Sequence, residues 1–546
     1  MSKRRVVLIA AGLSLLYLLI QAVYLWRLPL VMDEFDGANE AYQLLDLTPY
    51  KDYRPYKTVL GYYIQLPPLL LTGDPWTGLM LSKFWLALIN AAAIFGSTLA
   101  LASIFSPSAA LIGQLLLISV TTFLERSSEI RVDMLTAWFG LASFLLLLRQ
   151  RWSMAGLLAG ASFLVSQKGI YYIVAGNAAA GIFWLIESRD RGTFRNLLKM
   201  NVAVVSVIAV YIAFWGILST PSSVFNAIFL SHGNIVFTQM YDLEQHWRRT
   251  LGRNPLFYWG AVGGIVALVI ARWRGRVGTA HLMTAAYATV LFALCRWHKQ
   301  PWPYFFVLLI PTLMVVHVAI AEVVWRHAKW RTIAGAAMIL LGVAWPLTYM
   351  PGILERDHAY QRQVVKRARA ILDADDTYLA GNDLIYDRHQ SLAALRRLAT
   401  AHLENMRQWP PERVEALIGD LERARPKLVI DDVRMRLMPA TLRAYFDRRF
   451  APFWPSINVY APLVPPSETE FDLWFDGDYR VEPSSDSAVV DGVHHAAGSV
   501  VRLQRGPHRN GSSSPVRLRL KPPVLLAPGD VQTGGHRPMF ARAYDY

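Results

Sequence analysis

Long apolar stretches alternate with short polar links through the first 350 residues of the chain. A stretch of about 20 apolar residues can cross the hydrocarbon core of a bilayer as an α-helix. Eleven stretches can be drawn, at about 6–27, 79–104, 107–124, 133–148, 153–166, 170–186, 200–219, 255–271, 279–295, 303–324 and 332–350. The fifth is short for a span, and we expect it to be tilted, broken or largely buried in protein. The pattern predicts a polytopic α-helical membrane protein with about 11 transmembrane helices.

The pattern changes after about residue 355, where charges become frequent and apolar runs become short. ERDHAYQRQVVKRARAILDADD and PPERVEALIGDLERA have helical spacing, whereas KLVIDD, FAPFWPSINVYAP, FDLWFDGDYRVE, SAVVDGV and SVVRLQRG are typical of strands. We expect a transmembrane domain at 1–354, an extramembrane α/β domain at 355–466 and a β-rich extension at 467–546. The tail after about Pro507 is rich in Gly, Pro, Ser and Arg, and we expect it to be partly disordered.

Composition supports a membrane protein with a soluble part. Hydrophobic residues make up 54% and charged residues 17% of the 546 residues, whereas soluble domains carry about 25% charged residues. These values exclude a disordered, fibrous or ordinary cytosolic protein. Cys295 is the only cysteine, which excludes an internal disulfide and a cysteine-based zinc or iron–sulfur site.

The net charge of +15 is unevenly placed. Residues 1–354 hold 28 Lys and Arg against 15 Asp and Glu, whereas residues 355–546 hold 27 against 25. A nucleic-acid-binding protein would concentrate its positive charge on a soluble module. Here the excess lies between apolar stretches, which is the pattern of basic cytoplasmic loops.

These basic links predict the orientation. The chain starts MSKRR, so we place the N-terminus in the cytoplasm, and alternation puts four strongly basic links on the same side. They contain Arg149/Arg151, Arg189–Lys199, Arg272/Arg274/Arg276 and Arg326/Lys329/Arg331. A cleaved signal peptide is the alternative for the N-terminus, but the apolar run continues to about Trp26 without a clear cleavage site. An odd number of spans places the C-terminal domain outside.

The first outer loop, about 31–78, begins with a cluster of acids. They are Asp33, Glu34, Asp36 and Glu40. A carboxylate at membrane depth is costly and usually functional or paired, and it could take a proton from an acceptor hydroxyl as a general base. The alternative is a helix-end acid that faces water. Alternation later in the loop predicts short interfacial helices.

The other outer loops carry mixed charges and aromatic residues. LERSSEIRVDM places Glu129 and Asp133 on one face if it is helical, or forms an ion-pair cap on two spans. Lys168 stands in the short link SQKG, where it either snorkels or meets an anion. The loop at about 220–254 is long enough to fold over a site. RWHKQPWPYFF combines His298 and Lys299 with aromatic residues, which suits either a lipid phosphate or an interfacial aromatic belt.

Five segments together resemble the GT-C fold glycosyltransferases, in the branch of protein O-mannosyltransferases and lipid A aminoarabinose transferases. They are Asp33-Glu34 directly after the first span, Lys57-Thr58-Val59-Leu60-Gly61-Tyr62-Tyr63, Arg131-Val132-Asp133-Met134-Leu135, Ser166-Gln167-Lys168-Gly169 and HKQPWPYFFVLLIP. The resemblance covers about residues 1–350. The second segment lacks the two prolines of the family's Lys-Pro-Pro-Leu-x-Tyr-Trp, and Arg54-Pro55 is a competing match.

The resemblance implies a GT-C-like fold that uses a polyprenyl-phosphate sugar on the outer face. By it, Asp33 would be the catalytic base, with Glu34 supporting it or binding the acceptor, and Asp133 as a further catalytic candidate. Lys57 would hold the donor phosphate. The same role is extended to Arg54, Arg131, Lys168, His298 and Lys299. A divalent cation between Asp33 and Asp133 is left open.

We therefore expect a glycosyltransferase in a bacterial inner membrane, with its site and its C-terminal domain facing the periplasm. The donor would be an undecaprenyl-phosphate sugar, and the acceptor an envelope lipid, a glycan or a protein. One alternative is a transporter or flippase of lipid-linked sugars, which should show internal repeats and charges near the midplane. Another is a membrane anchor for the outer domain. That domain would shape acceptor binding or contact a partner.

Overall fold

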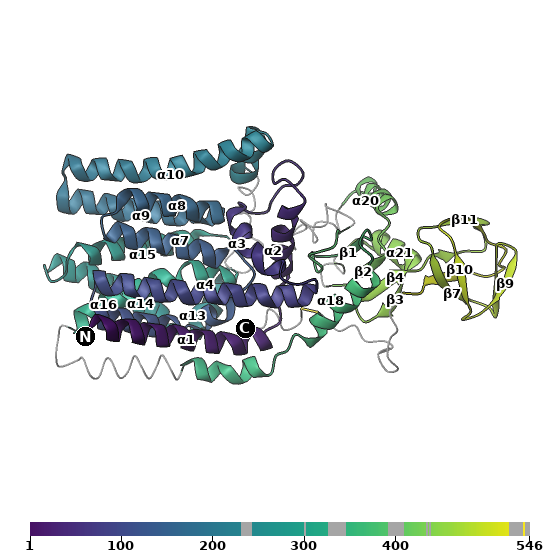
Figure 1. Cartoon of the computed structure of the whole chain (residues 1–546), viewed down its shortest axis with the longest axis horizontal. Coiled ribbons are helices and arrows are strands. Elements are labelled where there is room, and N and C mark those ends of the chain that lie inside the picture. The colour runs from purple at the N-terminus through teal and green to yellow at the C-terminus, as the bar shows by residue number, and fades with distance from the viewer. Residues whose placement is uncertain are drawn as a thin grey trace.

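The computed structural model describes residues 1–230, 243–299, 302–325, 345–390, 409–432, 435, 438–522 and 539–540. Figure 1 shows two bodies along the long axis, a bundle of helices and, at one end of it, an outer domain that contains the described strands. The chain begins at the end of the bundle farthest from the outer domain. Helix α18 (Ala359–Ile371) lies where the two bodies meet.

Among the residues that the structure describes, five helices are long and apolar enough to cross a membrane. They are α1 (Lys3–Arg27), α4 (Pro75–Ile104), α9 (Ile170–Phe183) with the turns on either side of it, α10 (Arg191–Leu218) and α14 (Pro255–Trp273). Other helices lie among them: α5 (Pro107–Leu117), α7 (Asp133–Leu148), α8 (Trp152–Val165), α15 (Thr279–Trp297) and α16 (Ile310–Trp325). The predicted helical membrane protein is confirmed. Ten predicted stretches coincide with helices, but most of 332–350 lies outside the described residues, so the count of eleven spans stays a prediction.

The short fifth stretch, α8, is largely buried against α7 and α10. Burial in protein was one of the three arrangements predicted for it, beside a tilt and a break. Gly156 and Gly160 stand four residues apart on its buried face. A Cβ atom at Gly156 would lie 2.1 Å from the carbonyl oxygen of Met200 in α10. Small residues at this spacing let two membrane helices approach closely, so α8 packs tightly against α10 at these two glycines.

The third predicted stretch is broken rather than continuous. Helix α5 ends at Leu117, and the short helix α6 (Thr121–Arg126) follows after Ile118–Val120. Asn254 caps α6 from the start of α14, since its Oδ1 accepts hydrogen bonds from the backbone N–H of Thr121 at 2.9 Å and from its hydroxyl at 2.6 Å. Residues 127–132 are not helical. The condition under which Glu129 and Asp133 would share one helix face is therefore not met.

The first outer loop forms the short helices that its pattern predicts, α2 (Met32–Tyr42) and α3 (Leu60–Leu69). Both lie at the end of the bundle that faces the outer domain (Figure 1). The loop at about 220–254 contains α11 (Pro221–Phe225) and α13 (Leu243–Arg253), and residues 231–242 lie outside the described part of the chain. Whether this loop folds over a site stays a prediction.

The first part of the outer domain is a mixed α/β unit. Its elements after α18 are β1 (Tyr378–Ala380), α20 (Pro411–Ala424), β2 (Leu428–Ile430), α21 (Ala440–Arg449), β3 (Phe450–Trp454) and β4 (Ile457–Tyr460). The sheet has the order β1-β2-β4-β3, with β1 and β2 parallel and the other pairs antiparallel. The predicted helices and strands of this unit are confirmed where they are described.

The strands after β4 form a second unit. They are β5 (Leu463–Val464), β6 (Glu470–Leu473), β7 (Gly477–Pro483), β8 (Ser487–Val490), β9 (Val493–Ala496), β10 (Val500–Leu503), β11 (Gly506–Arg509) and β12 (Val516–Leu520). One sheet has the order β10-β7-β12-β5, and β11–β6 and β8–β9 form two further pairs. The residues that follow Pro507 include β12, which is central in a sheet, and partial disorder further along the tail stays a prediction. Residues 523–538 and 541–546 lie outside the described part.

Candidate active site at the outer end of the bundle

Asp33 stands in the first turn of α2, at the end of the bundle next to the outer domain. Carboxylates in the first turn of a helix are stabilised by the exposed N–H groups and by the helix dipole. The side chain of Asp33 keeps 32% of its surface exposed and forms an ion pair with Arg131. The Asp33 carboxylate is therefore partly accessible to solvent and also has a fixed cationic partner.

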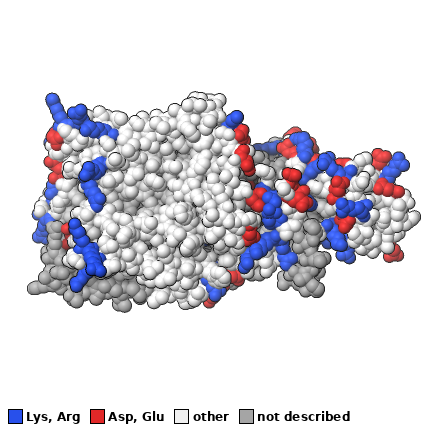
Figure 2. Space-filling model, viewed as in Figure 1, with Lys and Arg blue, Asp and Glu red and all other residues white. Residues whose placement is uncertain are grey.

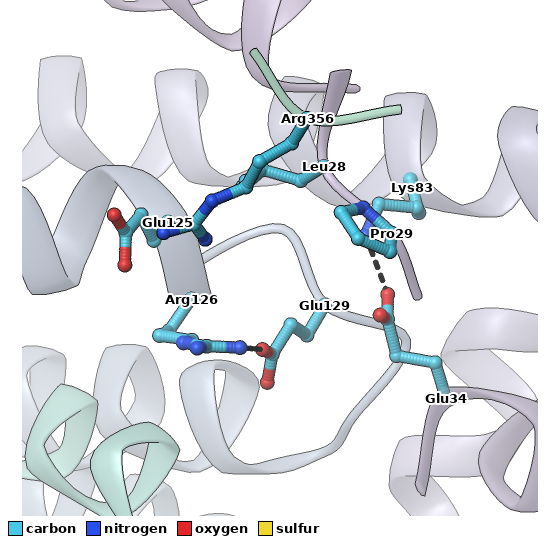
Figure 3. Close-up of a pocket in the computed structure, with 8 residues that line it drawn as sticks. All are labelled: Leu28, Pro29, Glu34, Lys83, Glu125, Arg126, Glu129 and Arg356. Carbon is cyan, nitrogen blue, oxygen red and sulfur yellow. Dashed lines mark hydrogen bonds and ion pairs between the residues drawn. The ribbon is translucent and has the colours of Figure 1, made fainter. Parts of the chain in front are cut away.

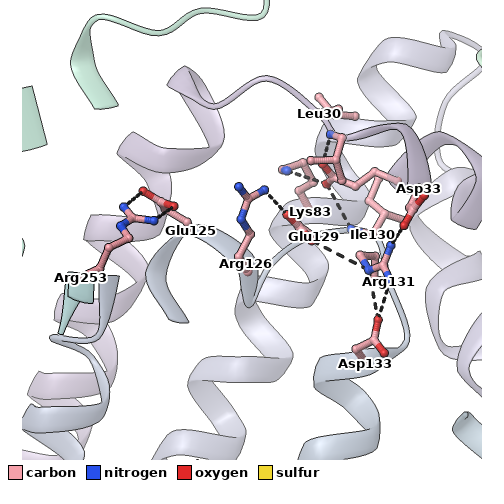
Figure 4. Close-up of polar contacts among 12 residues, drawn as sticks. Leu30, Asp33, Lys83, Glu125, Arg126, Glu129, Ile130, Arg131, Asp133 and Arg253 are labelled. Carbon is pink, nitrogen blue, oxygen red and sulfur yellow. Dashed lines mark hydrogen bonds and ion pairs between the residues drawn. The ribbon is translucent and has the colours of Figure 1, made fainter. Parts of the chain in front are cut away.

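Arg131 lies between two carboxylates, as Figure 4 shows. Its guanidinium contacts Asp33 on one side, and on the other its Nε and Nη2 lie 3.1 and 2.9 Å from Oδ2 of Asp133. The guanidinium carbon also lies 3.4 Å from the ring centre of Tyr304, a cation–π contact. With only 12% of its side chain exposed, Arg131 is held in place from three directions.

Asp133 begins α7 and extends the group to a second cation. Its Oδ1 lies 2.6 Å from Nζ of Lys168, which stands in the turn between α8 and α9. Lys168 also lies 5.3 Å from the ring centre of Phe305. The structure therefore brings together four residues that the sequence singled out in three separate loops: Asp33, Arg131, Asp133 and Lys168.

Lys57 lies beside this group but forms no ion pair with the described residues. Its ammonium stands 4.4 Å from the ring centre of Tyr56 and interacts electrostatically with Asp133, Arg131 and Asp33. Burial lowers the pKa of Lys57 to about 8, and nearby Arg131 adds to this effect. Lys57 is thus a cation near neutral pH, next to a network whose other members already hold one another.

The structure gives the remaining cation candidates different surroundings. Arg54 is exposed and donates a hydrogen bond to the carbonyl of Asn226 at 3.1 Å. Nδ1 of His298 lies 2.8 Å from the hydroxyl of Tyr171, and its ring stacks on Phe305 at 4.3 Å. Burial lowers the pKa of His298 to about 3, so it is neutral at pH 7 and adds no positive charge. Lys299 forms no ion pair within the described part of the chain.

Glu34 differs from its neighbour Asp33, because it is only 1% exposed and engaged on all sides. Its Oε1 lies 2.6 Å from Nζ of Lys83 and accepts a hydrogen bond from the backbone of Ile130 at 3.2 Å. Its Oε2 accepts a hydrogen bond from the backbone of Val31 at 2.9 Å. Of the two roles predicted for Glu34, these contacts favour support of Asp33 over acceptor binding, and the role stays a prediction. The side chain ties the start of α2 to α4 and to the segment that carries Arg131.

Comparison with known proteins gives a match in structure alone. No protein-family model matches the chain, and no curated protein matches its sequence. ArnT from Cupriavidus metallidurans, solved without ligand and bound to undecaprenyl phosphate, superposes with a TM-score of 0.60 in both states. The identity is 15%, over 83% and 84% of this chain and 98% of ArnT. Both states of ArnT have the GT-C fold. This chain has a GT-C fold.

A second GT-C protein matches over a larger part of this chain. The oligosaccharyltransferase of Archaeoglobus fulgidus superposes with a TM-score of 0.50 and 12% identity, over 91% of this chain and 74% of the archaeal protein. The fold that the sequence segments predicted is therefore confirmed. At these identities the likeness concerns the arrangement of the chain, and the chemistry must be argued from the side chains of this GT-C protein.

The charged residues of LERSSEIRVDM divide into two groups on the GT-C bundle. Arg126 and Glu129 pair at 2.7 Å, and Arg253 holds Glu125 with two contacts of 2.7 and 2.5 Å. These four residues link α6, α13 and the loop before α7, as the ion-pair cap predicted. Arg131 and Asp133 instead join Asp33, and an ion pair of 4.0 Å between Glu129 and Arg131 links the two groups.

A small pocket is lined by Glu34, the residue that follows Asp33 (Figure 3). Acidic and basic side chains line it in similar number, among them Lys83, Arg126, Glu129 and Arg356. Burial raises the pKa of Glu129 to about 7, opposed by Arg126 and reinforced by Glu34. The pocket is a polar, charge-balanced space beneath the loop that positions Arg131.

The arrangement of the described residues does not fit a divalent cation between Asp33 and Asp133. The Arg131 guanidinium occupies the space between the two carboxylates. Among the residues that the structure describes, no group of three acidic, histidine or cysteine side chains could hold a metal ion. The reaction proposed below therefore uses no metal ion.

Two residues that support the site were not identified from the sequence. Lys83 lies inside the second apolar stretch and is 4% exposed, and a lysine in such a stretch is itself a signal of a partner. Tyr304 stood in one of the segments that carried the resemblance, but nothing in the pattern pointed to its stacking on Arg131. The roles of Lys83 and Tyr304 both depend on contacts with residues that are distant in the chain.

Proposed function

We propose that this protein is a membrane glycosyltransferase. It moves a sugar from a polyprenyl-phosphate donor to a hydroxyl of an envelope lipid, a glycan or a protein. The observation that carries the proposal is the outward-facing contact of a carboxylate, Asp33, with a group of cations at the outer end of a GT-C bundle. ArnT, which shares the fold, has been solved with bound undecaprenyl phosphate, and this supports a polyprenyl-phosphate donor.

The proposed reaction is a displacement at the anomeric carbon. The bond from this carbon to the phosphate oxygen breaks, the bond to the acceptor oxygen forms, and Asp33 takes the acceptor proton. The phosphate departs with an additional negative charge, which Lys57, Arg131 and Lys168 stabilise. A single displacement of this kind inverts the anomeric configuration.

The balance of charges fits an anionic ligand. Two carboxylates, Asp33 and Asp133, face three cations, Arg131, Lys168 and Lys57. Glu129 also lies 4.0 Å from Arg131, but its charge is balanced by Arg126 at 2.7 Å. One phosphodiester charge would balance the group. Arginine binds phosphate with two hydrogen bonds, so an arriving donor competes with Asp33 for the guanidinium of Arg131. Donor binding would then release the carboxylate for proton transfer.

The proposed location is a bacterial inner membrane, with a cytoplasmic N-terminus and a periplasmic outer domain. Figure 2 shows a nearly charge-free belt across the bundle, with Lys and Arg at the end where the chain begins. Exposed cations at that end include Lys3, Arg151 and Arg191. Basic residues mark the cytoplasmic side of membrane proteins, which supports this orientation. In the proposed orientation Asp33 faces the periplasm.

The direct test offers purified protein in liposomes a panel of undecaprenyl-phosphate sugars with an envelope extract, and in parallel the matching nucleotide sugars. We expect transfer from one of the lipid-linked donors and none from nucleotide sugars. Transfer from a nucleotide sugar without lipid phosphate would contradict the proposal. Movement of the lipid-linked sugar between leaflets without transfer would instead support the transporter.

A further inference from the structure

We infer that Gln361 of the outer domain is a positioning residue for Asp33. It holds the backbone that leads into α2, the helix whose first turn carries the proposed base. The inference rests on the proposed function of Asp33. It gives the outer domain a role in the reaction, although none of the described side chains of that domain forms an ion pair with the charged group around Arg131.

The contact between Gln361 and the chain before α2 is reciprocal. The backbone N–H of Leu30 donates to Oε1 of Gln361 at 2.9 Å, and Nε2 of Gln361 donates to the carbonyl of Leu30, also at 2.9 Å. Nε2 further donates to the carbonyl of Met539 at 3.1 Å. Gln361 is 2% exposed and Leu30 is fully buried. Water therefore does not replace these bonds when the amide is removed.

The backbone position of Leu30 directly affects the position of Asp33. The next residue, Val31, is the N-cap of α2, and its N–H binds the carboxylate of Glu34. Glu34 is in turn fixed by Lys83 and Ile130. The first turn of α2 is therefore held by Gln361 on the side of the outer domain and by Glu34 on the side of the bundle. Asp33 lies between these two points of attachment in the chain.

The rest of α2 is also held by the outer domain. The ring of Phe35 meets Phe540 edge to face at 6.0 Å, and Asp36 accepts a hydrogen bond from the backbone of Asp383 at 3.0 Å. Tyr386 packs on Tyr42 near the end of the helix, with ring centres 5.1 Å apart. Figure 1 shows α2 at the junction of the two bodies. Among these contacts, that of Gln361 is the one made by the chain that precedes Asp33, whereas the others follow it.

The expected effect of losing Gln361 is on the chemical step. A displacement of about 1 Å of a catalytic group can reduce the rate about hundredfold. The donor phosphate is proposed to bind to Lys57, Arg131 and Lys168, which do not contact Gln361. Its binding should therefore change little. A residue that merely keeps the outer domain folded would not separate the two quantities in this way.

The test compares Gln361→Ala with Gln390→Ala in the full-length protein. Gln390 is a matched control, because it is also buried, and its amide bonds only to the backbone of Ala380 and Asn382 within the outer domain. Gln361→Glu is the second variant, which keeps an acceptor for the N–H of Leu30 but loses both donated bonds. The readouts are kcat, the KM for the lipid-linked sugar, and hydrogen exchange of the α2 amides.

We expect Gln361→Ala to lower kcat about ten- to hundredfold with an unchanged donor KM, and Gln361→Glu to lie in between. The α2 amides should exchange faster than in the wild type, and Gln390→Ala should leave them unchanged. Equal losses of kcat in both alanine variants, or unchanged kcat and exchange in Gln361→Ala, would overturn the inference. Hydrogen exchange needs no turnover, so unchanged exchange refutes it even if the wild type transfers no sugar, which would count against the proposed function alone.

Discussion

Charged side chains at the outer end of the bundle are arranged so that nearly every one has a partner of opposite sign. Asp33 meets Arg131, Asp133 meets Arg131 and Lys168, and Glu34 meets Lys83. Burial of an unpaired charge costs several kcal/mol, so these pairs are required for folding as well as available for chemistry. Asp33 is distinguished from Glu34 by its exposure, which is 32% against 1%.

Lys57 predicts a pH dependence of donor use. Its pKa of about 8 means that the ammonium is charged below pH 8 and loses its charge as the pH rises through that value. Because kcat/KM reports ionisations of the free enzyme, we expect kcat/KM for the lipid-linked donor to fall above about pH 8. Lys57→Arg should remove this fall, since a guanidinium stays charged. Lys299→Arg is the control, and a fall that persists in Lys57→Arg would assign the ionisation to another group.

Glu34 predicts a loss of stability rather than of acceptor binding. Glu34→Gln leaves the ammonium of Lys83 buried without its counter-charge, which costs about 3–5 kcal/mol. Thermal unfolding in detergent should show a clearly lower midpoint. Asp420→Asn breaks the exposed pair with Arg423 and should change stability by less than about 1 kcal/mol. Equal midpoints for the two variants would refute the structural role of Glu34.

Most of the residues in the charged group could be predicted, but their partners could not. Asp33, Arg131, Asp133 and Lys168 were identified because charges are rare beside apolar stretches. The separate role of Glu34 depends on Lys83 and on the backbone of Ile130, which are distant in the chain. The neutral state of His298 likewise follows from burial beside Phe305 and Tyr171.

At the scale of elements, the contact of α8 with α10 makes a prediction about packing. Gly156→Ala would place a methyl group 2.1 Å from a backbone carbonyl of α10, which cannot move as a side chain can. We expect destabilisation of at least about 1 kcal/mol. Gly181→Ala in α9 meets nothing within 4 Å and should be neutral or slightly stabilising. Unfolding in detergent compares the two, and equal stability would contradict the close approach.

Element boundaries were predictable where the sequence itself carries a signal. Helix α7 begins at Asp133, an acid at the edge of an apolar run. The break between α5 and α6 was missed, because Ile118–Val120 contains neither Gly nor Pro and the cap of α6 comes from Asn254. Strand β12 was not predicted, because the tail that contains it is rich in Gly, Pro, Ser and Arg. Its residues Val516, Leu518 and Leu520 are nevertheless buried in alternation.

At the scale of the whole molecule, orientation decides which side the proposed reaction uses. Cys295 is buried, so a Cys295→Ser background allows single cysteines to be placed at exposed positions. We expect a membrane-impermeant maleimide to label Ser513→Cys in intact spheroplasts, and to label Ser153→Cys only after the membrane is opened. Both serines are exposed; Ser153 stands at the start of α8 in the bundle, and Ser513 lies between β11 and β12 in the outer domain. The reverse pattern would place Asp33 in the cytoplasm and exclude a periplasmic reaction.

The measurement that tests the central claim most directly is single-turnover transfer from a saturating undecaprenyl-phosphate sugar by Asp33→Asn. Asp46→Asn serves as the matched control, because Asp46 is an exposed acid in the same outer loop. Loss of a general base typically costs about 10²–10⁴ in rate, so we predict at least a hundredfold slower transfer in Asp33→Asn, with donor binding retained and Asp46→Asn at the wild-type rate. Transfer by Asp33→Asn at the wild-type rate would contradict the assignment of Asp33 as the base.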